Sequence, residues 1–131
     1  MSSRILVVDD DREIRRLLQD YLRENEYRVT AVADGKGMWE ALDSARIDLI
    51  VLDLMLPHID GIEVCRRLRT ARPALPILML TAKGQSRDRD LAERSGATMF
   101  MSKPFANAEI LAAVKAMGID IEPVEDPAQA T

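Results

Sequence analysis

Several short aliphatic runs of this chain end in, or lead into, polar side chains that could do chemistry. Three carboxylates, one hydroxyl and one ammonium stand there, in the order Asp9, Asp10, Asp53, Thr81 and Lys103. Three carboxylates brought close together would repel one another, and some would stay protonated without a cation. Oxygen ligands favour a hard ion such as Mg²⁺, which takes one or two carboxylates plus phosphate oxygens. The set therefore suits a magnesium-dependent site at which a carboxylate attacks a phosphoryl group and forms an acyl phosphate.

The elements that must position these side chains follow from the pattern of apolar residues. Aliphatic runs without alternation indicate buried strands, which we expect at residues 5–8, 28–32, 48–53, 75–80 and 98–101. After Asp11 the apolar residues fall on one helical stripe, with arginines and acids opposite. Further helices are expected around Met38 to Leu42, from Ile62 to Leu68, and at residues 87–95 and 105–117. Buried strands that are each followed by a helix imply a parallel sheet covered on both faces.

Such a sheet would gather the polar side chains, because ligands of open parallel sheets bind beyond the carboxyl ends of the strands. Each residue also has an ordinary explanation. An aspartate after a strand often caps the next helix, and we expect that role for Asp11 and Asp60. Thr81 could be a strand-end hydroxyl and Lys103 a solvated side chain. The accumulation of all these residues at one edge of the sheet favours a functional site.

Composition limits the class of protein. The chain has 131 residues, of which 47% are hydrophobic and 31% charged, as in one globular domain. A net charge of −4 argues against direct binding of nucleic acid by this domain. No apolar run is long enough for a membrane span, and a single cysteine, Cys65, suits a reducing cytoplasm. Residues 118–131 hold two prolines and several acids without periodicity, so we expect a domain at 1–117 and a tail or linker at 118–131.

The chain resembles the receiver domain of bacterial two-component response regulators over about residues 4–117. The motifs that carry the resemblance are Val7-Val8-Asp9-Asp10, Val51-Leu52-Asp53-Leu54-Met55-Leu56-Pro57, Asp60-Gly61, Leu80-Thr81-Ala82 and Lys103-Pro104-Phe105. The resemblance implies an α/β fold, a flavodoxin-like (βα)5 arrangement with a doubly wound parallel five-stranded sheet of order 2-1-3-4-5.

The resemblance also implies a phosphoacceptor and a metal site. A sensor histidine kinase or a phosphotransfer protein would phosphorylate Asp53. Mg²⁺ would be held by Asp10, Asp53 and the backbone carbonyl of Met55, with Asp9 acting through water. The protein would then be a signalling domain and not an enzyme, although it would catalyse its own phosphotransfer and a slow autodephosphorylation.

The same resemblance implies a switch. Thr81 and Lys103 would contact the phosphoryl group, and Phe100 stands at the family's aromatic switch position. We expect the signal to act through the face formed by the helix at 87–95, the fifth strand and the last helix.

Within the family, Asp-Leu-Met-Leu-Pro and Thr-Ala-Lys-Gly are closest to the receivers of winged-helix transcription regulators. Asp90, Glu93 and Thr98-Met99 depart from the residues usual at their dimer face. We therefore expect a monomer or weak dimer with an unidentified output partner.

Two other functions fit part of the pattern. Asp-x-Asp after a first strand also resembles the haloacid-dehalogenase phosphatases, with Asp9 as nucleophile and Asp11 as general acid. That reading leaves Asp53 unexplained, the phosphatase scaffold needs a further acidic motif beyond its lysine for the metal, and 131 residues are few for it. A phosphate-independent binding module with the receiver fold is the third alternative, but it would need neither the acid pair nor Thr81 and Lys103.

Overall fold

The computed structural model describes residues 3–54, 56, 60–81, 94 and 96–118. Five strands and four helices lie within these residues: β1 Arg4–Val8, α1 Arg12–Glu24, β2 Arg28–Val32, α2 Gly35–Ser44, β3 Leu49–Asp53, α3 Gly61–Ala71, β4 Ile77–Thr81, β5 Met99–Ser102 and α5 Asn107–Ala116. The helix predicted at 87–95 falls almost wholly outside the described residues. Among those that are described, no helix combines the length and the apolar character needed to cross a membrane.

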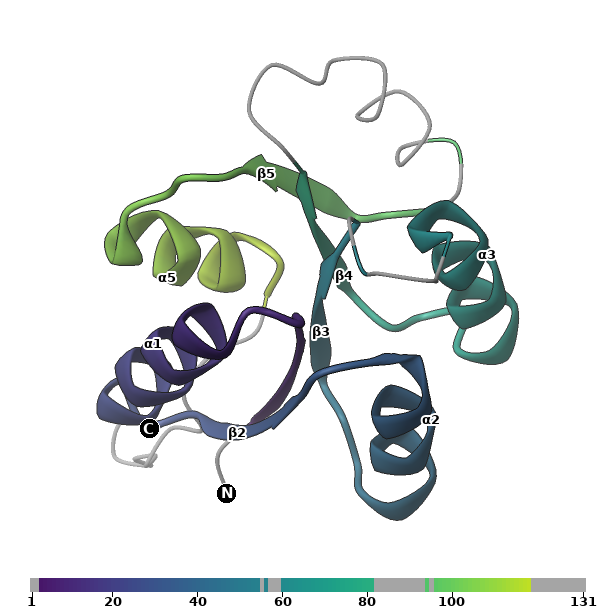
Figure 1. The fold of residues 1–131 in the computed structure, drawn as a ribbon, viewed down its shortest axis with the longest axis horizontal. Helices are drawn as coiled ribbons and strands as arrows, with labels where there is room; N and C mark the ends of the chain where they lie inside the picture. Colours follow the sequence, from purple (N-terminus) through teal and green to yellow (C-terminus); the bar gives the residue numbers. More distant parts are fainter. Residues whose placement is uncertain (1–2, 55, 57–59, 82–93, 95, 119–131) are drawn as a thin grey trace, which may run out of the picture.

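The strands form one parallel sheet in the order β2-β1-β3-β4-β5. This confirms the predicted (βα)5 sheet of order 2-1-3-4-5. Helices α1 and α5 cover one face of the sheet, and α2 and α3 cover the other (Figure 1).

The strands are apolar on both faces because both faces are covered. Leu6 and Val8 of β1 pack in the core beneath α2 and α3. The intervening Ile5 and Val7 pack in the core beneath α1 and α5. Successive side chains of a strand point to opposite faces, so a strand between two helical layers needs a continuous apolar run.

Three of the four described helices have an aspartate as N-cap, directly before the first helical residue. The Asp11 carboxylate accepts hydrogen bonds from the N–H groups of Glu13 and Ile14, at 2.9 and 3.3 Å, at the start of α1. Asp60 does the same at the start of α3, and Asp34 accepts from the Gly37 N–H at the start of α2. Each cap satisfies N–H groups that have no partner within the helix. The capping roles predicted for Asp11 and Asp60 are confirmed.

The first residue of α3 is a glycine because the helix begins against the end of β3. A Cβ atom on Gly61 would lie 2.6 Å from the carbonyl oxygen of Leu54. Only a residue without a side chain allows this approach. The contact holds the start of α3 next to the strand end that carries Asp53.

Candidate functional site

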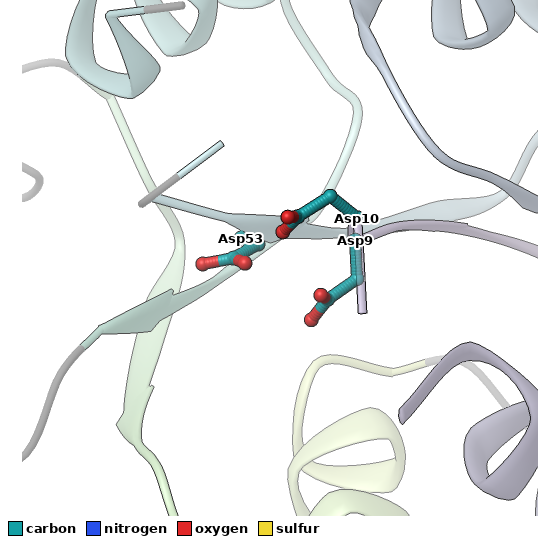
Figure 2. Close-up of side chains that lie close together, drawn as sticks. All are labelled: Asp9, Asp10 and Asp53. Atoms are coloured by element: carbon teal, nitrogen blue, oxygen red, sulfur yellow. The ribbon is translucent and has the colours of Figure 1, made fainter. Parts of the chain in front are cut away.

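Strand register brings two of the predicted carboxylates side by side. Strands β1 and β3 pair with Val8 opposite Leu52, and one residue further along each strand come Asp9 and Asp53. Both are almost completely buried, while Asp10 is exposed. One carboxylate oxygen from each of the three lies within 4.8 Å of the others. Figure 2 shows the Asp10 carboxylate extending toward Asp53, with that of Asp9 beside them.

Lys103 directly follows the edge strand β5, and its side chain reaches the cluster of three carboxylates from there. The last pair of the β4–β5 ladder is Thr81 with Ser102, and the Lys103 N–H then donates to the Thr81 carbonyl at 2.8 Å. Its Nζ lies 3.0 Å from Asp9 Oδ2 and 3.1 Å from Asp53 Oδ2. A carboxylate is costly to bury without an opposite charge, and Lys103 supplies that charge to both.

The backbone and side chain of Asp9 are held from several directions. Its N–H donates to the Val32 carbonyl at 3.1 Å, and its Oδ1 accepts from the Asp11 N–H at 2.9 Å. Its own carbonyl accepts from Arg15 Nη1 at 2.9 Å. Oδ2 has no exposed surface and forms an ion pair with the Lys103 ammonium, 3.0 Å away.

Charge and burial oppose each other at this site. Burial raises the pKa of Asp9, assisted by the negative charge of Asp53, and outweighs the lowering by the Asp11 N–H and by Lys103. Burial alone would lower the pKa of Lys103, but Asp9 and Asp53 raise it above its usual value. Lys103 therefore stays an ammonium at neutral pH. One ammonium does not fully offset the clustered carboxylates.

The donor set suits a hard divalent cation. The three clustered aspartates offer only oxygen ligands, and the exposed position of Asp10 leaves room for water on the ion. Mg²⁺ prefers such ligands and usually retains several waters. The backbone carbonyl of Met55, which the resemblance adds to the ligand set, lies outside the described residues.

The two predicted switch residues lie close by in the fold. Thr81 ends β4 and is buried, and its hydroxyl donates to the Met101 carbonyl of β5 over a long 3.4 Å. Phe100 of β5 is half-buried and packs on the core beneath α2 and α3. In this conformation the Thr81 hydroxyl is thus directed toward β5.

One contact of the site was not predicted. The arginines of the first helix were expected on its polar face, yet Arg15 is half-buried and its guanidinium donates to the Asp9 carbonyl. Helical side chains lean toward the N-terminus and cover the preceding turn. The contact spans six positions, from the helix to the turn before it, so helical spacing does not reveal it.

Comparison with known proteins agrees with this geometry. The family model of the response regulator receiver domain matches residues 5–115. The alkaline phosphatase synthesis transcriptional regulatory protein PhoP of Bacillus subtilis is 46% identical over 117 residues, which are 89% of this chain and 49% of that protein. The response regulator MprA of Mycobacterium ulcerans is 46% identical over 117 residues, 89% of this chain and 50% of that protein. The chain thus spans about half the length of the curated relatives that it matches.

A solved structure matches nearly end to end. The chemotaxis response regulator CheY4 of Vibrio cholerae superposes with a TM-score of 0.83 at 28% identity, covering 89% of this chain and 99% of that one. Family model, fold and acidic cluster thus all point to a receiver domain. The chain belongs to the response regulator receiver domain family, the phosphoacceptor signalling domains of two-component systems.

Proposed function

We propose that Asp53 accepts the phosphoryl group from a phosphohistidine of a sensor kinase or phosphotransfer protein. The observation that carries this proposal is the position of Asp53 Oδ2, 3.1 Å from the Lys103 ammonium and inside the acidic cluster. A carboxylate oxygen of Asp53 attacks the phosphorus as the bond from phosphorus to the imidazole nitrogen breaks. The imidazole leaves with the electron pair, and the product is an acyl phosphate.

The neighbouring residues neutralise and position the transferred group. Lys103 offsets negative charge on the phosphoryl oxygens, because its ammonium already lies beside Asp53. Asp10, Asp53 and the Met55 carbonyl would hold Mg²⁺, with Asp9 acting through water. The bound ion would add charge neutralisation at the phosphoryl oxygens, which loose phosphoryl transfer mainly requires.

We assign to the same residues a self-catalysed transfer from small phosphodonors and a slow autodephosphorylation.

The switch begins at Thr81. Its hydroxyl turns from the Met101 carbonyl to a phosphoryl oxygen, exchanging a long hydrogen bond for a charge-assisted one. The space that it leaves allows Phe100 to move inward. This couples the acceptor to β5 and to an output partner that reads the change.

The wider assignment is also a proposal. Residues 1–117 form the receiver, and 118–131 form a tail or linker. The domain acts in the cytoplasm as a monomer or weak dimer and does not itself bind nucleic acid. The negative net charge supports the absence of direct nucleic-acid binding, and the single cysteine suits a cytoplasmic setting.

Phosphate mapping tests the assignment. The wild type and the Asp53→Asn, Asp9→Asn and Asp43→Asn variants are incubated with labelled acetyl phosphate and Mg²⁺, and the acid-labile label is measured. We expect no label on Asp53→Asn, slower labelling of Asp9→Asn, and normal labelling of Asp43→Asn, which changes an exposed aspartate of α2. Label that persists in Asp53→Asn and disappears in Asp9→Asn would instead support the phosphatase alternative.

A further inference from the structure

We propose that Arg15 is a positioning residue for phosphoryl transfer, which holds the aspartate turn, residues 9–11, in the geometry that binds the cation. The inference rests on the proposed function of Asp53 as acceptor. It concerns a residue that contacts neither the phosphoryl group nor the ion.

The first observation is that the Arg15 side chain binds a main-chain atom of the aspartate turn. Its Nη1 donates to the main-chain carbonyl of Asp9 at 2.9 Å. That carbonyl belongs to the peptide that joins Asp9 to Asp10, and peptides are planar. The hydrogen bond therefore restrains the orientation of the peptide from which Asp10 continues. On the other side of the same residue, the Asp9 N–H is tied to the Val32 carbonyl at 3.1 Å.

The second observation is that Arg15 joins the turn to the helix at two points. Its main-chain N–H donates to the Asp11 carbonyl at 3.0 Å, in the first turn of α1. Its side chain then reaches back past Asp11 to Asp9. The aspartate turn is thus connected to α1 through both the backbone and the side chain of one residue. The neighbouring Arg12 and Arg16 are exposed, whereas Arg15 is half-buried.

The third observation concerns charge. Three consecutive carboxylates at residues 9–11 repel one another, and Arg15 brings a positive charge next to them. Because its contact is with a neutral carbonyl, that bond occupies no carboxylate oxygen. Lys103, in contrast, lies against Asp9 and Asp53 themselves. Arg15 can therefore order the turn and still leave the ligand oxygens to a cation.

The test compares Arg15→Ala with Arg16→Ala, which removes the same charge from the adjacent, exposed position. For each folded variant, calorimetric titration gives the Mg²⁺ concentration for half-saturation, and acetyl phosphate labelling gives the rate at saturating Mg²⁺. We expect Arg15→Ala to raise that concentration about tenfold, at the lower end of what outer-shell partners of metal ligands contribute. Arg16→Ala should change it less than about twofold, because exposed charges are screened.

Conservative variants separate positioning from charge and from folding. Arg15→Lys keeps the charge and can reach the carbonyl in part, so it should fall between the wild type and Arg15→Ala. Arg15→Gln, with a shorter neutral donor, should resemble Arg15→Ala. Circular dichroism checks folding, and if Arg15→Ala does not fold, the comparison of Arg15→Lys with Arg16→Lys decides instead.

Two outcomes would overturn different claims. If the Arg15 and Arg16 variants require the same Mg²⁺ concentration while Asp53→Asn takes no label, Arg15 does not position the turn, but the proposed function stands. If Asp53→Asn is labelled like the wild type, the proposed function itself is wrong.

Discussion

At Asp9, a carboxylate with no exposed surface shares a single lysine with Asp53. Its raised pKa means that the folded protein binds a proton on the Asp9 carboxylate more tightly than the unfolded chain does. The stability that the protonated group contributes is present below its ordinary pKa of 3.8 and is lost as the pH rises through the folded value. Ionisation of Asp9 therefore costs the fold stability as the pH rises.

Replacing this carboxylate should stabilise the protein. In the absence of divalent cations, we expect Asp9→Asn to raise the free energy of unfolding by about 1–2 kcal/mol, since it removes an incompletely compensated buried charge. The amide oxygen can still accept the hydrogen bond from the Asp11 N–H. Urea unfolding at about pH 5 and about pH 8 should show a larger gain at the higher pH.

Magnesium provides the control for this prediction. A cation that binds only the folded protein stabilises it by mass action, so saturating Mg²⁺ should narrow the gap between Asp9→Asn and the wild type. A variant that is less stable than the wild type at every pH without Mg²⁺ would contradict the charge balance inferred for Asp9.

Two adjacent aspartates should separate cation binding from helix capping. Asp10 is exposed and belongs to the acidic cluster, whereas the Asp11 side chain caps α1. Asp10→Asn should weaken Mg²⁺ binding about tenfold or more and leave stability almost unchanged. Asp11→Ala should lower the free energy of unfolding by about 1 kcal/mol through the lost cap, with a smaller effect on Mg²⁺. Calorimetric Mg²⁺ titration and thermal melting measure the two effects, and equal losses of affinity would contradict the division.

At the scale of elements, the start of α3 depends on one close contact. Gly61→Ala would place a Cβ 2.6 Å from the Leu54 carbonyl oxygen, so the helix start or the strand end must move. We expect a loss of about 2–3 kcal/mol of stability and slower phosphorylation of Asp53 at the adjacent strand end.

Gly118→Ala is the matched control for this prediction. No heavy atom lies within 4 Å of a Cβ at that position, although its φ of +83° disfavours side chains. A loss of about 1 kcal/mol and normal phosphorylation are expected there. Gly61→Ala with wild-type stability and phosphorylation would show that the contact is unimportant.

All five strands could be predicted from the sequence; both ends of the second were correct, whereas the ends of the fourth and fifth were not. The fourth and fifth strands were expected at 75–80 and 98–101, and they lie at Ile77–Thr81 and Met99–Ser102. The fourth strand begins later than predicted because Leu75, although apolar, lies outside the ladder: its N–H donates to the Arg72 carbonyl in a turn. Thr98, the predicted first residue of the fifth strand, uses its side-chain hydroxyl to accept from the Ile77 N–H. Ile77 and Thr98 are 21 positions apart in the sequence, so a local pattern cannot reveal their contact.

Contacts of an arginine are harder to predict from the sequence. Arg69 shares α3 with the exposed Arg66 and Arg67, but its guanidinium donates to the carbonyls of Gly96 and Pro73, at 2.7 and 2.8 Å. It connects the end of α3 to the segment before β5. The acidic cluster and Lys103 were predictable because strand ends meet at one edge, whereas an arginine can reach partners in many directions.

At the scale of the whole molecule, the proposed switch should appear at one edge of the sheet. Strand β5 is an edge strand, and each of its residues is only half-buried, so little burial opposes its rearrangement. Adding beryllofluoride, a phosphoryl mimic, with Mg²⁺ should change hydrogen exchange mainly between residues 82 and 105. Part of that interval, including the helix predicted at 87–95, lies outside the described residues.

The control is Asp53→Asn, in which these exchange changes should be absent. Sedimentation of the wild type with the mimic should show a monomer or a weak dimer. Changes confined to the residues that touch Asp53, or found chiefly on α1, would place the signalling face elsewhere, and a tight dimer would contradict the expected oligomeric state.

The distance in sequence between Asp53 and Lys103, 50 positions, has a consequence for a protein that is still being made. A ribosome releases all three clustered aspartates well before the lysine, and β5 can join the sheet only beside a completed β4. Until then the carboxylates lack the ammonium that offsets their charge and that of an incoming phosphoryl group. Under the role proposed for Asp53, we therefore expect a nascent chain to carry the acceptor without its assisting lysine, and to become able to receive a signal only after synthesis has passed Lys103.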